Sequence, residues 1–184
     1  MNSRATPPLD TPRRIRRLAN CVRLLSSVGA LAVLTLLQLF WSQPGWVERL
    51  ARDDWGLKAV QLDPGSRLLG CAASMLPGGV ALLALWQLWS LFGCYARGEL
   101  LTLRPAGHLR RLGLALIGLA AALPLGHTLT VLALTWGNPP GQRVLWFGLS
   151  SQHYLSLLFG LVLLALATVL AEAARVAREH SEFV

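Results

Sequence analysis

Charged residues are scarce in this chain. Only 14% of its 184 residues are Asp, Glu, Lys or Arg, and Lys58 is its single lysine. A soluble domain usually has about 25% charged residues. The uncharged residues are gathered into long runs, at 24–47, 68–96, 112–142 and 144–171. A soluble helical bundle needs polar faces at helical spacing, and these runs are apolar all round, which argues against that class.

Cysteine and catalytic motifs are also scarce. The three cysteines, Cys21, Cys71 and Cys94, are not spaced like metal ligands, so we expect free thiols packed as small hydrophobic side chains. The chain has no HExxH, GxSxG or phosphate-loop motif, and no Asp or Glu lies inside an apolar run. We therefore predict no catalytic site, no cofactor and no metal, in a protein that is not an enzyme.

The apolar runs are long enough to cross a membrane. A hydrocarbon core about 30 Å thick needs ~20 apolar residues as a helix, and every run is longer. We predict an all-α fold, a polytopic transmembrane four-helix bundle that forms a single membrane domain. The first run has no small-residue cleavage site after it, which favours an uncleaved span. The predicted parts are a tail (1–20), spans near 22–41, 68–95, 109–136 and 148–171, and a polar helical end (172–184).

Basic residues are distributed unevenly between the two ends of the predicted bundle. One end has the arginines of the tail, the second loop and the C-terminal helix, and most of the basic residues are there. Basic loops remain in the cytoplasm, so we expect both termini there, in a multi-pass protein of the bacterial cytoplasmic (inner) membrane. The net charge of +8 then reflects topology, and we expect the lipid bilayer rather than nucleic acid as a partner.

The first outer loop, residues 42–67, is the longest connection. Within it Trp46, Val47, Leu50 and Ala51 recur at helical spacing, opposite charged residues. This pattern predicts a short amphipathic helix on the membrane surface.

Small residues recur four positions apart in the second and third predicted spans. Membrane helices associate where small residues let their backbones approach. The pattern fits packing within the bundle, and the contact face of a homo-oligomer remains the alternative. The candidate packing residues are Gly70, Ser74, Gly78, Gly118, Ala122 and Gly126.

His127 is the ionisable side chain that lies well inside a predicted span, about one turn after Pro124. Ionisable groups inside a membrane are functional candidates, for example in a proton or ion path. Thr35, Gln38 and Ser74 are polar residues that a path could also use. The alternative is a neutral histidine that bonds to a backbone carbonyl or a hydroxyl group.

Two local patterns resemble a known family. The first covers residues 91–102 (LFGCYARGELLT) and continues at 108–113 (HLRRLG), and the second is the C-terminal run 171–184. Together they resemble the bacterial "domain of unknown function 2975" proteins over residues 20–184. The family's second span is followed by a Tyr-x-x-Gly-Glu-hydrophobic element; it often has an aromatic residue where this chain has Leu101.

The resemblance implies four spans and no established activity. Members often lie beside small DNA-binding regulators, which implies a regulatory role. We expect Gly98 to end a helix and Glu99 to pair with an arginine such as Arg104 or Arg110. The candidate cytoplasmic interaction motif is Tyr95, Arg97, Gly98, Glu99, Arg110 and Arg111.

Two functional hypotheses follow from these residues. The first is a non-enzymatic membrane component that acts through contacts with a membrane or cytoplasmic protein, in regulation or signalling. The second is a small transporter or channel subunit that uses His127 and a break of the second span at residues 77–79.

Overall fold

The structure is a computed structural model that describes residues 13–57, 60, 62–99, 102–139, 143–145 and 147–182. The predicted tail before residue 13, Leu100, Leu101 and residues 183–184 lie outside these ranges. Every regular element within them is an α-helix, and four of the helices are long and apolar enough to cross a bilayer, as predicted. The elements are α1 (Arg13–Ser42), α2 (Pro44–Asp53), α3 (Pro64–Ala96), α4 (Leu103–Thr135) and α5 (Ser151–Glu182).

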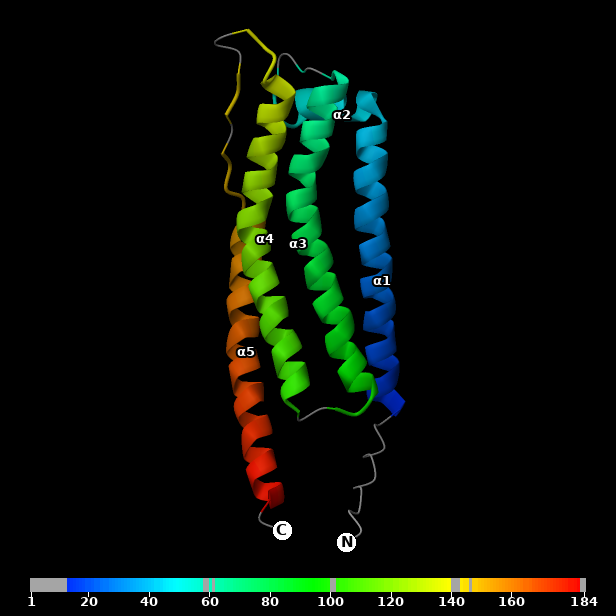
Figure 1. Cartoon of the computed structure of the whole chain (residues 1–184), viewed down its shortest axis with the longest axis vertical. Helices are drawn as coiled ribbons and strands as arrows, with labels where there is room; N and C mark the ends of the chain where they lie inside the picture. The colour runs from blue at the N-terminus through cyan, green and yellow to red at the C-terminus, as the bar shows by residue number, and fades with distance from the viewer. Residues whose placement is uncertain are drawn as a thin grey trace.

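The last helix begins three residues later than predicted, at Ser151 instead of 148. The His153 N–H donates to the Ser150 carbonyl at 3.0 Å, and the Ser150 N–H donates to His153 Nδ1 at 2.9 Å. This reciprocal pair caps the first turn and sets the start of the helix. At its other end α5 continues through the charged residues 172–179 and extends beyond its neighbours (Figure 1).

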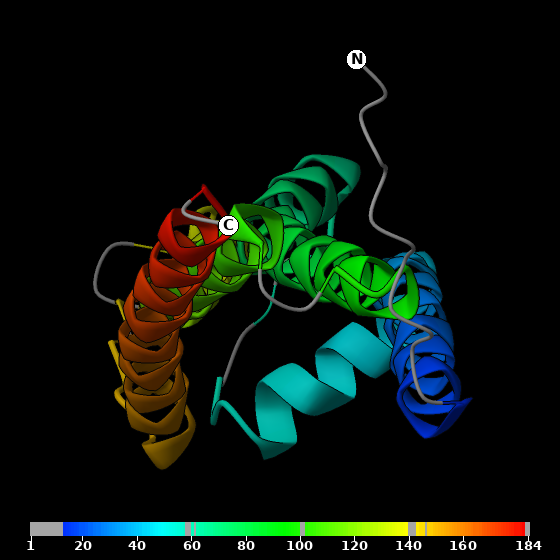
Figure 2. The same cartoon turned by 90° about the horizontal axis from the view of Figure 1, so that it is seen from below.

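The long helices form an open row. Contacts join α1 to α3, α3 to α4 and α4 to α5. Seen along the helices, the row is curved, and α1 and α5 lie apart at its two ends (Figure 2). The predicted bundle therefore does not close among the described residues. Lipid tails solvate an apolar helix as well as other side chains do, so no hydrophobic force requires closure.

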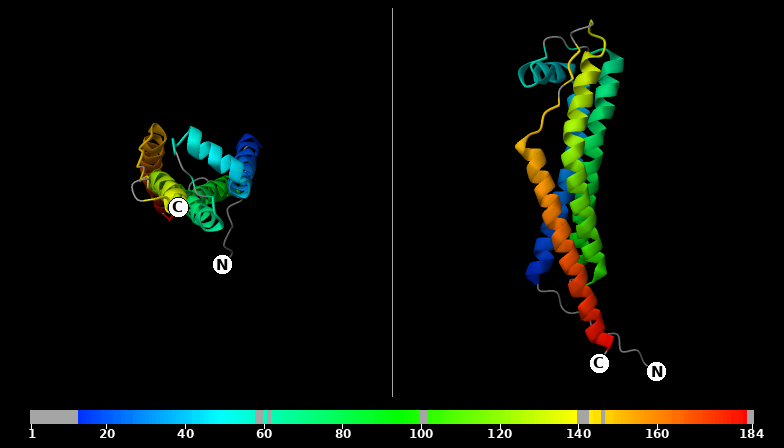
Figure 3. Two further views of the ribbon diagram at one scale, coloured as in Figure 1. Left: turned by 90° about the horizontal axis from the view of Figure 1, so that it is seen from above. Right: turned by 90° about the vertical axis from the view of Figure 1, so that its left-hand side faces the viewer.

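The short helix α2 lies across the concave side of this row. It is at the end opposite to the start of α1 and the end of α5 (Figures 1 and 3). Its N-terminus follows α1 directly, and the connection from α2 leads to α3, where Asp63 is the N-cap. The Asp63 carboxylate accepts from the N–H groups of Gly65 and Ser66, and its pKa is lowered chiefly by a hydrogen bond from the Ser66 hydroxyl. We call this the α2 end, and the opposite one the termini end.

Small residues set the closest approaches between helices. Gly70 of α3 lies under the ring of Trp41 from α1, and Gly126 of α4 lies against the Pro77 ring of α3. Gly113 of α4 and Gly160 of α5 face each other at the α4–α5 crossing. Side chains larger than hydrogen would separate these helices, so the order of the row depends on them.

The other candidate packing residues contact neighbouring helices less tightly. Ala122 is buried, and the Ser74 hydroxyl lies 3.4 Å from the Thr130 hydroxyl across α3 and α4. A Cβ on Gly78 would lie 3.8 Å from Leu37, and one on Gly118 would lie 3.7 Å from Val80, which are ordinary contacts. The helix α3 continues through Pro77 and the two glycines after it, so the expected break at 77–79 does not interrupt the helix.

Replacing Gly160 by alanine tests the α4–α5 crossing. The new Cβ would lie 2.7 Å from Ile117 Cγ1 and 2.8 Å from the Gly113 backbone oxygen. We expect the free energy of unfolding to fall by about 1–3 kcal/mol, measured by reversible unfolding in mixed micelles. Gly79→Ala is the matched control because its Cβ would meet nothing within 4 Å. Equal losses in the two variants would contradict this packing.

Candidate functional site

The motif after α3 folds into a compact helix end. Arg97 is the C-cap of α3, and Gly98 has a φ of +82°. The Gly98 N–H donates to the Tyr95 carbonyl at 3.1 Å, and the Glu99 N–H donates to the Cys94 carbonyl, also at 3.1 Å. These two bonds form a Schellman motif, which satisfies carbonyl groups that a helix end leaves free. Glycine suits the left-handed position because it has no Cβ to crowd the backbone.

The Glu99 carboxylate is held beside this helix end by arginine. Arg97 Nε donates to Glu99 Oε1 at 3.0 Å, and Arg104 Nη1 lies 3.9 Å from the same oxygen. The hydrogen bond from Arg97 is the main reason why the pKa of Glu99 lies below its ordinary value. Both arginines are largely exposed, so each pair contributes about 0–1 kcal/mol.

The remaining residues of the motif are not gathered around Glu99. Tyr95 is half-buried and packs edge-to-face on Phe92, with 5.5 Å between the ring centroids. Arg110 and Arg111 are exposed on α4, and neither forms an ion pair within the described ranges. The motif is therefore a structured turn with a separate pair of free cations on the next helix.

At the α2 end, the short helix α2 is partly buried in protein. Val47 and Ala51 are both 0% exposed. Val47 packs with Trp41 and Leu134, and Ala51 belongs to a second apolar cluster that contains Val131 of α4. Helix α2 is thus held against α1 and α4 by its small apolar side chains, a contact that its amphipathic pattern alone did not predict.

His127 lines an open pocket on the concave side, beside α2. This His127 pocket has a volume of about 350 Å³. The Trp55 ring packs edge-to-face on the imidazole, with 4.9 Å between centroids. The hydroxyls of Ser74 and Thr130 each donate to a carbonyl of their own helix at 2.8 Å, so their protons are already used. The lining residues are Phe40, Leu50, Trp55, Ser74, Pro77, Leu123, Gly126, His127 and Thr130.

The other polar residues proposed for a path lie elsewhere. Thr35 and Gln38 of α1 are exposed, and neither lines the His127 pocket. No group of three His, Cys, Asp or Glu side chains that could hold a metal ion occurs in the part of the chain that the structure describes. The three cysteines are free. The His127 pocket is therefore mainly an apolar space with one imidazole on its wall.

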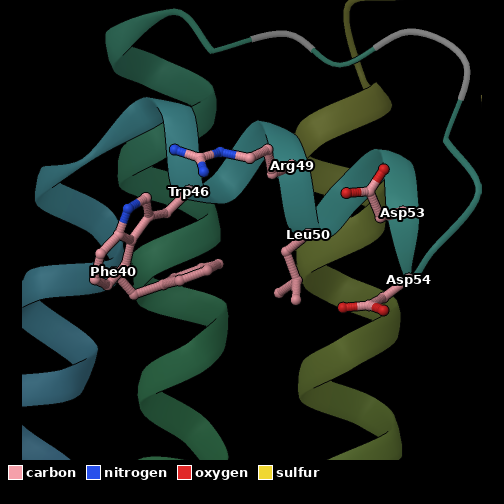
Figure 4. Close-up of a pocket in the computed structure, with 6 residues that line it drawn as sticks. All are labelled: Phe40, Trp46, Arg49, Leu50, Asp53 and Asp54. Atoms are coloured by element: carbon pink, nitrogen blue, oxygen red, sulfur yellow. The ribbon is translucent and has the colours of Figure 1, made fainter.

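A second pocket lies on α2 itself, and no motif in the sequence marks it. This α2 pocket has a volume of about 440 Å³, and its charged residues are Arg49, Asp53 and Asp54 (Figure 4). It shares Phe40 and Leu50 with the His127 pocket, and Trp46 completes its lining. The charged side chains of the predicted amphipathic helix were the one sequence signal for this pocket. They line a cavity only because α2 packs on α1 and α4.

Two polar contacts nearer the termini end were also missed. The Arg23 guanidinium lies 4.2 Å from the centroid of the Trp89 ring, which joins α1 to α3 by a cation–π contact. His108 Nδ1 lies 2.9 Å from Gln87 Oε1, which joins α4 to α3. Neither pair is visible in sequence because its members come from different helices.

The fold defines an all-α, multi-pass membrane protein. Its chain belongs to the family described as protein of unknown function (DUF2975), whose family model matches residues 57–184. The match begins after α2, later than the expected start at residue 20, so α1 and α2 lie outside it. No curated protein and no solved structure matches this chain.

The left-handed turn at Gly98 can be tested by substitution. We expect Gly98→Ala to lower the free energy of unfolding by about 1 kcal/mol, because alanine is strained at a φ of +82°. Gly98→Asn should lose less, since asparagine tolerates this conformation. Unfolding of both variants in mixed micelles gives the comparison, and an alanine variant as stable as the wild type would exclude a strained turn.

Proposed function

We propose that this protein is a non-enzymatic interaction or regulatory component of the bacterial inner membrane. In this proposal both termini lie in the cytoplasm, and the termini end binds an acidic surface of a membrane or cytoplasmic protein. A second copy of the chain is an alternative partner, and nucleic acid is not expected. The four long apolar helices support a membrane protein, and the family match supplies no activity.

The observation that carries the proposal is exposed positive charge at the termini end. Arginines near the N-terminal ends of both α1 and α4 are exposed. Among the described residues, no ion pair joins α1 to α4, and none joins either helix to α5. Beside them the charged end of α5 extends past its neighbours (Figure 1). Basic residues that only anchor a helix in the membrane need to reach no farther than the lipid headgroups. A charged helix that projects past the headgroups also offers a surface to a protein partner. The exposed arginines of α1 and α4 that form no ion pair with a described residue are Arg13, Arg14, Arg16, Arg17, Arg110 and Arg111.

Charge reversal tests this surface in native membranes. A photo-crosslinking residue placed at Gly107, where a Cβ would meet nothing within 4 Å, should capture a discrete protein. We expect Arg110→Glu/Arg111→Glu to reduce that product at least tenfold, because like charges would then face an acidic partner. Arg52→Glu/Arg143→Glu makes the same charge change at the α2 end and should leave the product unchanged. Equal crosslinking in the two double variants would contradict the proposal.

A small transporter or channel subunit is the second candidate, and the His127 pocket is the observation that favours it. The pocket is open on the concave side and places an imidazole against about 350 Å³ of space. Intramembrane ionisable groups that line cavities commonly serve ion or proton paths.

Flux through liposomes tests this second candidate. If His127 relays protons, liposomes that contain the purified protein should become acidic inside when the outside medium is made acidic. His127→Ala should abolish that proton flux. Gln38→Ala is the matched control, because Gln38 is a polar residue outside the pocket. Flux that persists in His127→Ala would end the case for this residue.

A further inference from the structure

The α2 pocket and the His127 pocket adjoin each other on the concave side of the row. Both are lined by Phe40 and Leu50. The remaining lining of the α2 pocket is mostly charged, whereas the remaining lining of the His127 pocket is mainly apolar and comes from α3, α4 and the residues after α2. The combined space therefore has a charged part and an apolar part, which is the polarity of an amphiphilic molecule.

The charged part has both signs. Arg49 and Asp53 are four residues apart on α2, so their Cβ atoms are about 5–6 Å apart. Arg49 Nε donates to the Gly45 carbonyl at 3.2 Å, and Figure 4 shows its side chain directed away from the two carboxylates. Arg49, Asp53 and Asp54 form no ion pair with any described residue. The Arg49 guanidinium and the carboxylates of Asp53 and Asp54 could therefore pair with a ligand that has both a negative and a positive group.

The neighbouring charges of the same helix are arranged differently. Glu48 and Arg52 form an ion pair with each other and do not line the α2 pocket. The buried Val47 and Ala51 fix the rotation of α2, so the pocket residues stay on the concave side. Helix α2 therefore separates a self-paired set of charges from an unpaired set that borders a cavity.

The membrane decides what class of molecule can fill this space. An apolar groove that opens sideways in a bilayer is filled by acyl chains, since water in it would lack polar partners. Indole rings prefer the headgroup level, and the α2 pocket contains Trp46. A headgroup beside α2 would meet a guanidinium that suits a phosphate and carboxylates that suit an ammonium.

We propose that the concave side at the α2 end binds one zwitterionic phospholipid with a primary ammonium group. Its phosphate lies at Arg49, its ammonium group lies at Asp53 and Asp54, and an acyl chain occupies the His127 pocket. A trimethylated headgroup fits less well because it has no N–H to donate to the carboxylates. This inference goes beyond the proposed interaction at the termini end and does not depend on it, because the two concern opposite ends of the molecule. It competes with the transporter candidate, because the acyl chain would fill the space beside His127.

Lipid binding to the delipidated full-length protein tests the proposal. Native mass spectrometry would follow titration with phosphatidylethanolamine, phosphatidylcholine and phosphatidylglycerol of identical chains. We expect phosphatidylethanolamine to bind about fivefold more tightly than either of the others, a difference of about 1 kcal/mol. Asp53→Asn/Asp54→Asn should remove the preference over phosphatidylcholine, and Arg49→Gln should weaken binding of all three lipids.

Matched variants on the same helix separate this site from a general charge effect. Glu48→Gln and Arg52→Gln change the same charges outside the pocket, and both should keep the wild-type preference. Leu123→Trp fills the His127 pocket, so it should weaken the binding of all three lipids to the same extent. Circular dichroism and the unfolding midpoint of each variant show whether it is folded.

Several outcomes would overturn the proposal. Equal binding of the three lipids by the wild type excludes a headgroup site, and a preference for phosphatidylglycerol indicates an anionic lipid instead. A preference that survives Asp53→Asn/Asp54→Asn in the folded protein places the ammonium group elsewhere. A lipid-free dimer that masks the concave side would assign this surface to a second copy of the chain.

Discussion

Close backbone contact at small residues is the constraint on which this structure depends. In lipid, each long helix satisfies its own backbone hydrogen bonds, and burying an apolar side chain against another helix gains little over burying it in acyl chains. What remains is van der Waals contact where the helices can approach. Gly113 against Gly160 joins α4 to α5, Gly126 against Pro77 joins α3 to α4, and Trp41 over Gly70 joins α1 to α3.

The same constraint explains the open shape. Only 11% of the most apolar window of α1 or α5 is buried inside the protein, against 28% for α4. Helix α4 is central because it meets α3, α5 and the buried side of α2. The open concave side gives the two ends different characters. The termini end exposes arginine, whereas the α2 end is a cavity built jointly by α1 and α2, which precede the family match, and by α3 and α4 within it.

Particular residues show which features of the structure could be predicted from the sequence pattern. The Tyr-x-x-Gly-Glu element marked a helix end, and Gly98 in it has a positive φ. This turn could be predicted because it depends on residues close in the chain. The spacing of Val47 and Ala51 marked an amphipathic helix, but the same spacing suits a lipid surface and a protein surface equally. Gly113 was not singled out, because its partner Gly160 is on another helix and no small residue lies four positions from Gly113 on its own helix.

The amino-acid sequence by itself determined the long apolar helices, the short helix between the first two and the concentration of arginine at one end. These features follow from composition and from interactions between residues close in the chain. Only the tertiary structure decided the order of the row, its open side, the burial of α2 and the pockets beside His127 and Arg49. Helices that are apolar on every side carry no periodic signal for which face meets which neighbour, so that choice is made by shape between residues far apart in the chain.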